Sequence, residues 1–397
     1  LWHEHCDLYA EAGFRFDIFG ANYDFTPDGV DETRYDSFHE RHPDWPIVAS
    51  ETGGSASTRG LYEQEYFEGE PLYPNPAPMA IPEPIYVNPK RKGIVSADGE
   101  TLTPWGSTIE QTWRNCADRD FLAGTFLWTG FDYRGETYPF DWPAVITRYG
   151  LLDLCGFPKD AFHYYRAWWR EDDPMVHLFP HWNWEAREGE IVDVWCYSNC
   201  AEVELLLNDA SLGRCVLERN GHLEWEVPYA PGRLEARGFD GQGNLLRTHI
   251  VETTGPAAAV RLTPARNVLH GDGDDVVTVE TAITDAEGRF VATADHEVTF
   301  EVSGPARILG VGNGNPTSHE ADKADRRKAF HGLCAVLIQS IGGDGAISLR
   351  ASSPGLAPCA CTLEADATPP RPAIHPAGGA ADDASAAGSE NPVNGLL

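Results

Sequence analysis

Two short stretches of this 397-residue chain place carboxylates where apolar runs end. Glu51 follows the apolar run 47–50 and stands just before a pair of glycines. Further along, the apolar run 121–127 leads into the aromatic and acidic segment 128–136 (WTGFDYRGE). A carboxylate can stabilise an oxocarbenium-ion-like transition state, and aromatic faces bind the C–H side of a sugar ring. These residue types therefore indicate chemistry at a glycosidic bond.

The elements that would position these residues alternate between helix and strand. A strand that delivers a carboxylate into a glycine-rich loop is typical of the C-terminal face of a β/α barrel. The fold class expected here is a partial (β/α)8 TIM barrel with a parallel sheet, of which three strands are recognisable, whereas a closed barrel has eight, so about five would lie upstream. Helices are expected at residues 6–14, 31–41, 105–120 and 158–169, and a strand is expected at 16–23.

The apolar pattern changes to a period of two from about residue 174. Strands are expected at 191–197 and 203–207, joined to the next strand by a hairpin turn at Asn208-Asp209. Short alternating strands continue to the chain's last apolar run, which predicts two immunoglobulin-like β-sandwich domains. The expected domains are the barrel part at 1–172, sandwiches at 173–254 and 255–365, and a disordered tail at 366–397, rich in Ala, Gly, Pro, Ser and Asp.

Charge and composition narrow the classes of partner. The net charge of −31 argues against nucleic acid and against anionic membrane surfaces, both of which need basic contacts. No apolar run approaches the length of a membrane span, and the odd number of cysteines, nine, favours reduced thiols and a cytoplasmic protein. The chain starts without Met or a signal peptide, as though the sequence began inside a folded domain. No cofactor is expected, and a homo-oligomer is left open.

Two segments resemble metal sites only in composition. His3-Glu4-His5 has alternating imidazoles but no evident third ligand. Residues 271–275 (GDGDD) lack the ligand spacing and the terminal Glu of a calcium loop, so an acidic turn is expected there. No metal site is predicted.

The motifs taken together resemble glycoside hydrolase family 2, and specifically its long β-galactosidases with additional immunoglobulin-like domains. The resemblance rests on Ser50-Glu51, on 57–60 (STRG) and on 126–136 (FLWTGFDYRGE), and it covers roughly residues 5–365. It implies retaining hydrolysis of β-galactosides with a carbohydrate substrate as the partner, and it implies that Glu51 is the nucleophile.

The same resemblance exposes a gap in the catalytic set. In the family, the general acid/base carboxyl follows an Asn, and no Asn-Glu dipeptide occurs in this chain. The chain by itself is therefore expected to be inactive as a glycosidase. Family members that act on glucuronides carry an Asn-x-Lys after the last barrel strand; the triplet here, Asn88-Pro89-Lys90, precedes that strand and is interpreted as chance. β-Glucuronidase and β-mannosidase activities stay open as alternatives.

Further site residues are expected around Glu51. Tyr23, at the end of the preceding strand, is placed to orient Glu51 with its hydroxyl, and Asn22 beside it is a candidate substrate ligand. Trp128 is expected to stack on the sugar. Asp132 and Glu136 could accept hydrogen bonds from sugar hydroxyls, or could instead cap the loop or pair with Arg134.

A function of another class competes with the glycosidase hypothesis. The chain could be a non-catalytic carbohydrate-binding or interaction unit in which the sandwiches matter and the barrel part is vestigial. The arrangement of Glu51 and Trp128 at consecutive strand ends favours catalysis, because a binding module has no need to place them so.

Overall fold

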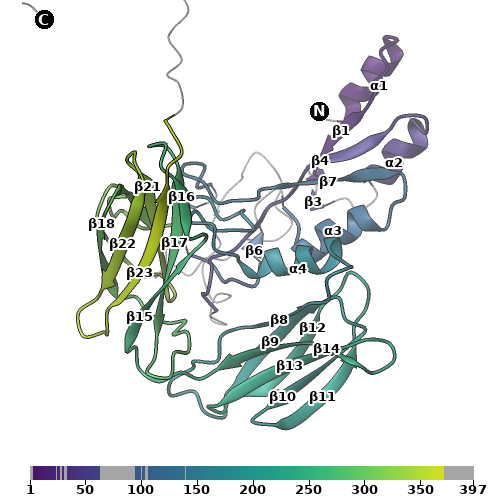
Figure 1. Ribbon diagram of the computed structural model, residues 1–397. Helices are drawn as coiled ribbons and strands as arrows, with labels where there is room; N and C mark the ends of the chain where they lie inside the picture. Colours follow the sequence, from purple (N-terminus) through teal and green to yellow (C-terminus); the bar gives the residue numbers. More distant parts are fainter. Residues whose placement is uncertain are drawn as a thin grey trace, which may run out of the picture.

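A computed structural model describes residues 3–23, 25–26, 29–30, 34–62, 94–99, 101–102, 106–138 and 140–370. The chain forms three units, one with a small parallel sheet and two rich in antiparallel strands (Figure 1). No helix in these ranges is long and apolar enough to cross a membrane. The first unit contains α1 (His3–Glu11), β1 (Phe19–Asn22), β2 (Phe25–Thr26), β3 (Gly29–Val30), α2 (Arg34–Arg41), β4 (Ile47–Gly53), β5 (Ser55–Ala56), β6 (Thr101–Leu102), α3 (Ile109–Ala117), β7 (Leu122–Trp128) and α4 (Asp160–Trp169).

The parallel sheet has the strand order β1-β4-β7, with β4 in the middle. Its apolar residues pack against α2, where the ring of Phe38 stacks on Phe19 with centroids 4.1 Å apart. Helix α3 begins with a capping box, in which Thr108 and Gln111 each accept a hydrogen bond from the other's backbone. The alternation of helix and strand that the sequence predicts is confirmed by these elements.

The second unit is a pair of sheets with the orders β11-β10-β13-β14 and β12-β9-β8. Asn208 and Asp209 have φ values of 50° and 66°, the left-handed pair that a two-residue hairpin requires, so the predicted turn is confirmed. Trp182 is fully buried in the core of the unit. The strands are β8 (Val176–Phe179), β9 (Ile191–Ser198), β10 (Glu202–Leu207), β11 (Ala210–Val216), β12 (Leu223–Pro228), β13 (Arg233–Phe239) and β14 (Leu245–Glu252).

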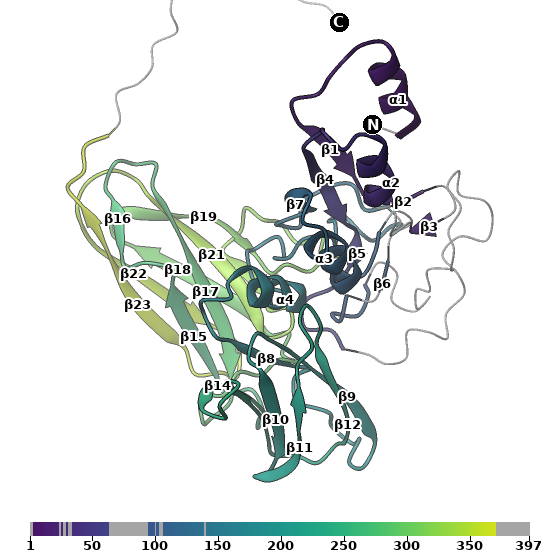
Figure 2. The same cartoon turned by 90° about the vertical axis from the view of Figure 1, so that its right-hand side faces the viewer.

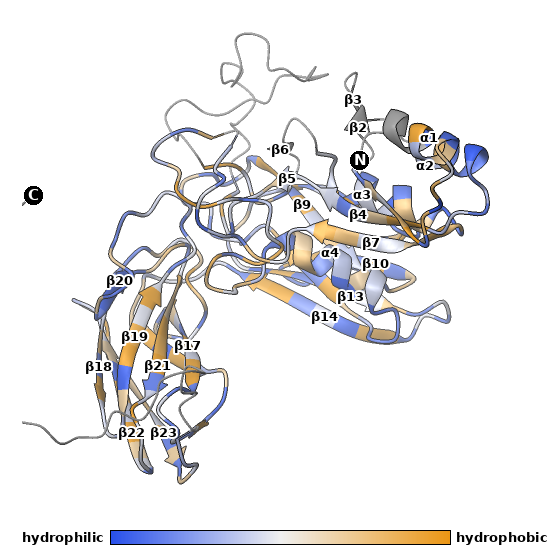
Figure 3. Cartoon of the chain, turned by 90° about the horizontal axis from the view of Figure 1, so that it is seen from above, coloured by the Kyte–Doolittle hydropathy of each residue, from blue (hydrophilic) through white to orange (hydrophobic). Residues whose placement is uncertain are grey.

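The third unit pairs a four-stranded sheet, β15-β17-β21-β19, with a five-stranded one, β16-β23-β22-β18-β20. Its strands carry both apolar and polar residues in Figure 3, because one side of each strand faces a single apolar core. The strands are β15 (Ala259–Pro264), β16 (Val268–His270), β17 (Val276–Thr284), β18 (Glu297–Ser303), β19 (Ala306–Gly312), β20 (Arg326–Lys328), β21 (Leu333–Ser340), β22 (Gly345–Ser352) and β23 (Cys359–Asp366).

Several predictions concern the ends and loops of the chain. The segment 271–275 forms an acidic turn in which Asp272 accepts the backbone N–H groups of Asp274 and Asp275. Strand β23 reaches Asp366, whose carboxylate accepts the N–H of Thr368. The rest of the predicted disordered tail, from 371 onward, lies outside the described residues, as does Asn88-Pro89-Lys90. Within the described ranges, no three His, Cys, Asp or Glu side chains are placed to hold a metal ion.

Helix α4 lies between the parallel sheet and the second unit in both Figure 1 and Figure 2, and it contacts β8 and β9. Asp160, its first residue, accepts hydrogen bonds from the Tyr62 hydroxyl at 2.6 Å and pairs with His177 Nε2 at 2.7 Å. The rings of His163 and His177 stack with centroids 3.7 Å apart, and His249 lies beside them. A group of imidazoles is thus enclosed where the first two units meet.

Stability should fall on mild acidification because of these imidazoles. Burial lowers the pKa of His163 to about 3 and that of His181 to about 4, and it also lowers the pKa of His177 and His249. The unfolded chain therefore takes up protons below an ordinary histidine pKa of about 6.5 while the folded chain does not, so the free energy of unfolding decreases from about pH 6.5 toward pH 4. Burial raises the pKa of Asp160 to about 6, which opposes part of this loss.

Melting temperatures measured from pH 7.5 to pH 4.5 test this expectation. His163→Gln should flatten the dependence, because one buried neutral imidazole is then lost. Equal slopes in the parent and His163→Gln would contradict the assignment.

Candidate active site

The carboxyl ends of the three parallel strands bring the predicted residues to one edge of the sheet. Glu51 lies in β4 opposite Asn22 at the end of β1, and Gly53 lies opposite Trp128 at the end of β7. Because parallel strands share a direction, side chains that are distant in sequence meet at this edge. The sequence-based grouping of Asn22, Glu51 and Trp128 therefore agrees with their placement in the sheet.

A short hydrogen-bond chain orients the Glu51 carboxylate. Ser50 Oγ donates to Asn22 Oδ1 at 2.6 Å, and Asn22 Nδ2 donates to Glu51 Oε2 at 3.2 Å. Since the amide oxygen of Asn22 is engaged by Ser50, its nitrogen is turned toward Glu51. Asn22 thus contacts the candidate nucleophile itself, and the substrate contact predicted for it stays a prediction.

Tyr23 supports the same corner through its backbone. Its N–H donates to the carbonyl of Glu51 at 2.6 Å, and its own carbonyl accepts a hydrogen bond from Arg34 at 2.8 Å. The φ of Tyr23 is 52°, a left-handed conformation that turns the chain sharply after β1. The contact with Glu51 therefore joins the two backbones, and the role expected for the Tyr23 hydroxyl stays a prediction.

The segment after β7 forms a second polar group around Tyr133. Trp128 Nε1 donates to the Tyr133 hydroxyl at 3.1 Å, and that hydroxyl donates to the Glu136 carboxylate. The rings of Trp128 and Tyr133 meet edge to face at 5.9 Å. Partial burial, the hydrogen bond to Glu136 and the charges of Glu136 and Glu51 together raise the pKa of Tyr133 to about 12. Tyr133 therefore stays a hydrogen-bond donor at neutral pH.

Tyr133 was missed by reasoning from the sequence. Its hydroxyl joins Trp128 to Glu136 by two hydrogen bonds. The charge of Glu51, the candidate nucleophile, contributes to the raised pKa of Tyr133. The available signal was its spacing, since an aromatic residue three positions before an acid in a loop can reach that acid. Trp128 and Glu136 are solvent-accessible here, as ligands of a sugar would have to be.

Asp132 is not placed with these residues. Its side chain is buried, it forms an ion pair with Lys159 at 2.8 Å, and it accepts the backbone N–H of Gly150. Burial raises the pKa of Asp132 to about 6 even though the Lys159 ammonium opposes the rise. An occupied, buried carboxylate has no free face for a sugar hydroxyl, so the placement favours the alternative in which Asp132 organises the loop.

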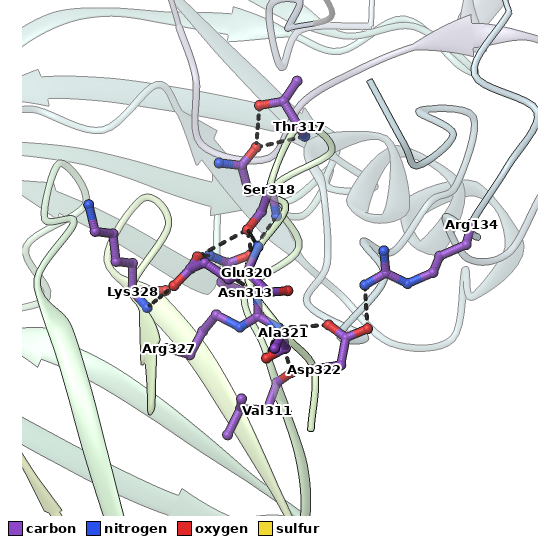
Figure 4. A network of polar contacts seen from close by, with 11 residues as sticks. Arg134, Val311, Asn313, Thr317, Ser318, Glu320, Ala321, Asp322, Arg327 and Lys328 are labelled. Atoms are coloured by element: carbon purple, nitrogen blue, oxygen red, sulfur yellow. Dashed lines mark hydrogen bonds and ion pairs between the residues drawn. The ribbon is translucent and has the colours of Figure 1, made fainter. Parts of the chain in front are cut away.

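Both loops of the site are fastened to the third unit. Arg59, after β4, pairs with Asp153 at 2.7 Å, and its guanidinium donates to the carbonyls of Asn313 and Phe330. In the loop after β7, Arg134 reaches across to Asp322, which also accepts a hydrogen bond from Arg327 (Figure 4). Arg134 therefore pairs with the third unit, whereas a partner within its own loop had been one alternative.

Removal of the Asn22 amide should impair catalysis more than binding. Asn22→Ala leaves the Glu51 carboxylate without its orienting donor, and a misplaced catalytic group can lower the rate by about 100-fold. We expect kcat to fall about 10- to 100-fold with a smaller change in KM. Ser50→Ala removes only the hydrogen bond to Asn22 and leaves the one from Asn22 to Glu51. This variant should therefore cause a smaller fall in kcat.

Steady-state kinetics of the two variants in the full-length protein that contains this chain provides the measurement. Asn22→Asp serves as a control, because it keeps the shape but replaces the donor by an acceptor. An Asn22→Ala enzyme with unchanged kcat would contradict the orienting role.

The chain matches known proteins both through family models and through individual relatives. Residues 260–362 match the model for glycoside hydrolase family 2 C-terminal domain 5, and 189–246 match a domain of unknown function. A β-galactosidase of Bacteroides ovatus is 37% identical over 335 residues, which are 82% of this chain and 37% of that protein. A putative β-glucuronidase of Formosa agariphila is 28% identical and shares 75% of this chain and 30% of its own length.

Solved structures agree with these matches. A β-glycosidase from Bacteroides vulgatus has a TM-score of 0.74 and 29% identity, with 91% of this chain and 48% of that chain covered. A family 2 glycosyl hydrolase from Bacteroides cellulosilyticus has a TM-score of 0.68 and 27% identity, with 88% and 42% covered. The chain thus spans less than half the length of these relatives. It belongs to glycoside hydrolase family 2.

Proposed function

We propose that the protein containing this chain is a retaining glycoside hydrolase of β-galactosides with Glu51 as its nucleophile. The observation that carries the proposal is the placement of Glu51 at the carboxyl edge of the parallel sheet, where Asn22 orients its carboxylate. Tyr133 and Glu136 form a polar group beside it, and Trp128 offers an accessible aromatic face. This set joins one oriented carboxylate to donors, acceptors and a ring surface suited to a sugar.

The proposed reaction has two steps. The Glu51 carboxylate attacks the anomeric carbon, the glycosidic bond breaks, and a glycosyl-enzyme forms while a second carboxyl protonates the leaving oxygen. Water then attacks the anomeric carbon, the second carboxyl takes the water's proton, and Glu51 is released. We assign no residue of this chain to the second carboxyl, because the family's Asn-Glu dipeptide does not occur in its 397 residues.

The domain assignment is part of the same proposal. Strands β1, β4 and β7 would be the last part of a β/α barrel in residues 1–172. The two antiparallel units would be immunoglobulin-like sandwiches at 173–254 and 255–365. Their role at the site would be to hold the loops at Arg59 and Arg134.

A galactoside is favoured as substrate over a glucuronide. The relative described as a β-galactosidase is 37% identical, compared with 28% for the one described as a putative β-glucuronidase. A sugar carboxylate requires a cationic partner, and Arg59 and Arg134, which follow β4 and β7, are already paired with Asp153 and Asp322. β-Glucuronides remain the second candidate because several relatives carry that description.

Product stereochemistry and substrate preference test the proposal. The full-length protein should release the β-anomer first from a β-galactoside, as followed by proton NMR before mutarotation, and should have a higher kcat/KM for the β-galactoside than for the matching β-glucuronide. Initial release of the α-anomer would overturn retention, and a preference for the glucuronide would overturn the substrate. Binding of sugars without turnover would favour the non-catalytic alternative.

A further inference from the structure

A cavity of about 400 Å³ opens where the three units meet. Tyr62 and Asp160 come from the first unit, His181 and His249 from the second, and Phe290 from the third. None of Asn22, Glu51, Trp128, Tyr133 and Glu136 lines it. The cavity is therefore separate from the candidate active site and belongs to the junction of the units.

Two histidines present hydrogen-bond donors in this cavity. His249 Nδ1 accepts the N–H of Leu178 at 2.8 Å, and His181 Nδ1 accepts the N–H of Asn183 at 3.3 Å. A neutral imidazole whose Nδ1 is an acceptor carries its proton at Nε2. Within the described residues, neither Nε2 atom has a hydrogen-bond partner. Two neutral N–H donors thus remain available to a molecule bound in the cavity.

Aromatic rings and an acceptor complete the lining. The ring of Tyr62 lies 5.6 Å from that of His181 and 6.1 Å from that of Phe179. Phe290 is 37% exposed at the junction. Glu252 lines the same space and can accept hydrogen bonds from hydroxyl groups. Ring faces combined with separate donors and acceptors suit a ligand that has both C–H surfaces and hydroxyls.

The arginine and lysine side chains that line the cavity are already paired with carboxylates of the protein. Arg59 pairs with Asp153 and Lys159 with Asp132, both at hydrogen-bonding distance. Arg289 pairs with Asp285 at 2.7 Å. All three cations therefore have carboxylate partners, and none is left to pair with an anionic ligand. The Glu252 carboxylate would in addition repel such a ligand. The electrostatics therefore disfavour an anionic ligand.

We propose that this junction cavity is a second binding site, for a neutral hydroxyl-rich ring compound of mono- or disaccharide size. His181 and His249 donate to ligand oxygens, Glu252 accepts from ligand hydroxyls, and the rings of Tyr62 and Phe290 contact its apolar face. Because all three units line the cavity, a bound ligand would also hold them together. The site is independent of hydrolysis at Glu51.

Thermal unfolding of the chain in increasing concentrations of galactose or lactose tests the site. Sugars raise melting temperatures of proteins generally through exclusion from the surface, but that effect does not saturate. A specific site adds a saturating increase, from which an apparent Kd follows. We expect saturation in the parent chain and an apparent Kd about tenfold or more weaker in His181→Ala/His249→Ala, because two donors are lost.

Matched variants separate binding from damage to the fold. His270→Ala changes an exposed histidine that does not line the cavity, so this variant should bind as the parent does. Glu252→Ala removes an acceptor at a partly exposed position and should also weaken binding, so the proposal stays testable if the double variant unfolds. Loss of saturation in Glu252→Ala with retention in His270→Ala supports the site.

Three results would overturn it. The first is a melting temperature that rises without saturation in the parent. The second is the same apparent Kd in the parent, the double variant and Glu252→Ala, which would place binding elsewhere. The third is glucuronate bound as tightly as galactose at equal ionic strength, which would contradict a neutral ligand. Each result is obtained with the unreacted sugar, so it stands whether or not Glu51 is a nucleophile.

Discussion

Glu51→Gln should lower kcat by about 10⁴-fold or more while changing KM little, since nucleophile removal elsewhere costs as much or more. The amide keeps the shape of the side chain and can still contact Asn22 across the strand ends. It cannot form a glycosyl ester, and it carries no charge to stabilise the developing cation. The lost interactions are those made at the transition state, so binding of the ground state is largely spared.

Initial rates with an aryl β-galactoside measure this effect in the full-length protein. Glu188→Gln, an exposed carboxylate of the second unit, is the matched control and should retain full activity. Glu51→Ala supplied with azide should regain turnover and form the α-galactosyl azide, because azide enters the space left by the side chain. Retention of more than a few per cent of activity by Glu51→Gln would rule out its assignment as nucleophile.

Asp132→Ala should destabilise the first unit by about 3–5 kcal/mol, the cost of leaving one member of a buried ion pair unpaired. Lys159 is 2% exposed, and its ammonium donates to Asp132 and to the carbonyls of Ser57 and Arg148. Without Asp132, a buried positive charge keeps only neutral partners. The N–H of Gly150 also loses its acceptor.

The measurement is chemical denaturation with hydrogen exchange as the readout. Hydrogen exchange reports the loss of stability within the first unit, which is needed because a chain of three units does not have to unfold in a single transition. Asp141→Ala removes an exposed carboxylate near the same loop and should change stability by about 0.5 kcal/mol or less. Asp132→Leu/Lys159→Met should be more stable than Asp132→Ala, since no charge is left buried. A change below about 1 kcal/mol in Asp132→Ala would contradict the role of the ion pair.

Local patterns were sufficient for several individual elements of the fold. The apolar runs before Glu51 and Trp128 predict two strands that do lie side by side, because a short continuous apolar run is typical of a strand in a parallel sheet. The turn at Asn208-Asp209 follows from residues that tolerate positive φ. These features depend on a few neighbouring residues, so the sequence alone contains them.

Contacts between distant segments were not predictable in the same way. The sequence proposed Asp132 as a sugar ligand, but its partner Lys159 is 27 residues away, and nothing local signals their pairing. Arg59 reaches carbonyls more than 250 residues further on in the third unit. Asn22 contacts Glu51 only because β1 pairs with β4 in that register. Whether an acid is a ligand or an anchor depends on such packing.

Covalent trapping of the intermediate tests the central claim most directly. The full-length protein is incubated with 2-deoxy-2-fluoro-β-galactosyl fluoride, whose fluorine slows breakdown of the glycosyl-enzyme and whose leaving group needs little protonation. Intact-mass analysis should show one added fluorosugar, and peptide mapping should place it on the Glu51 side chain. Label on another carboxylate, or equal labelling of Glu51→Gln, would contradict the account.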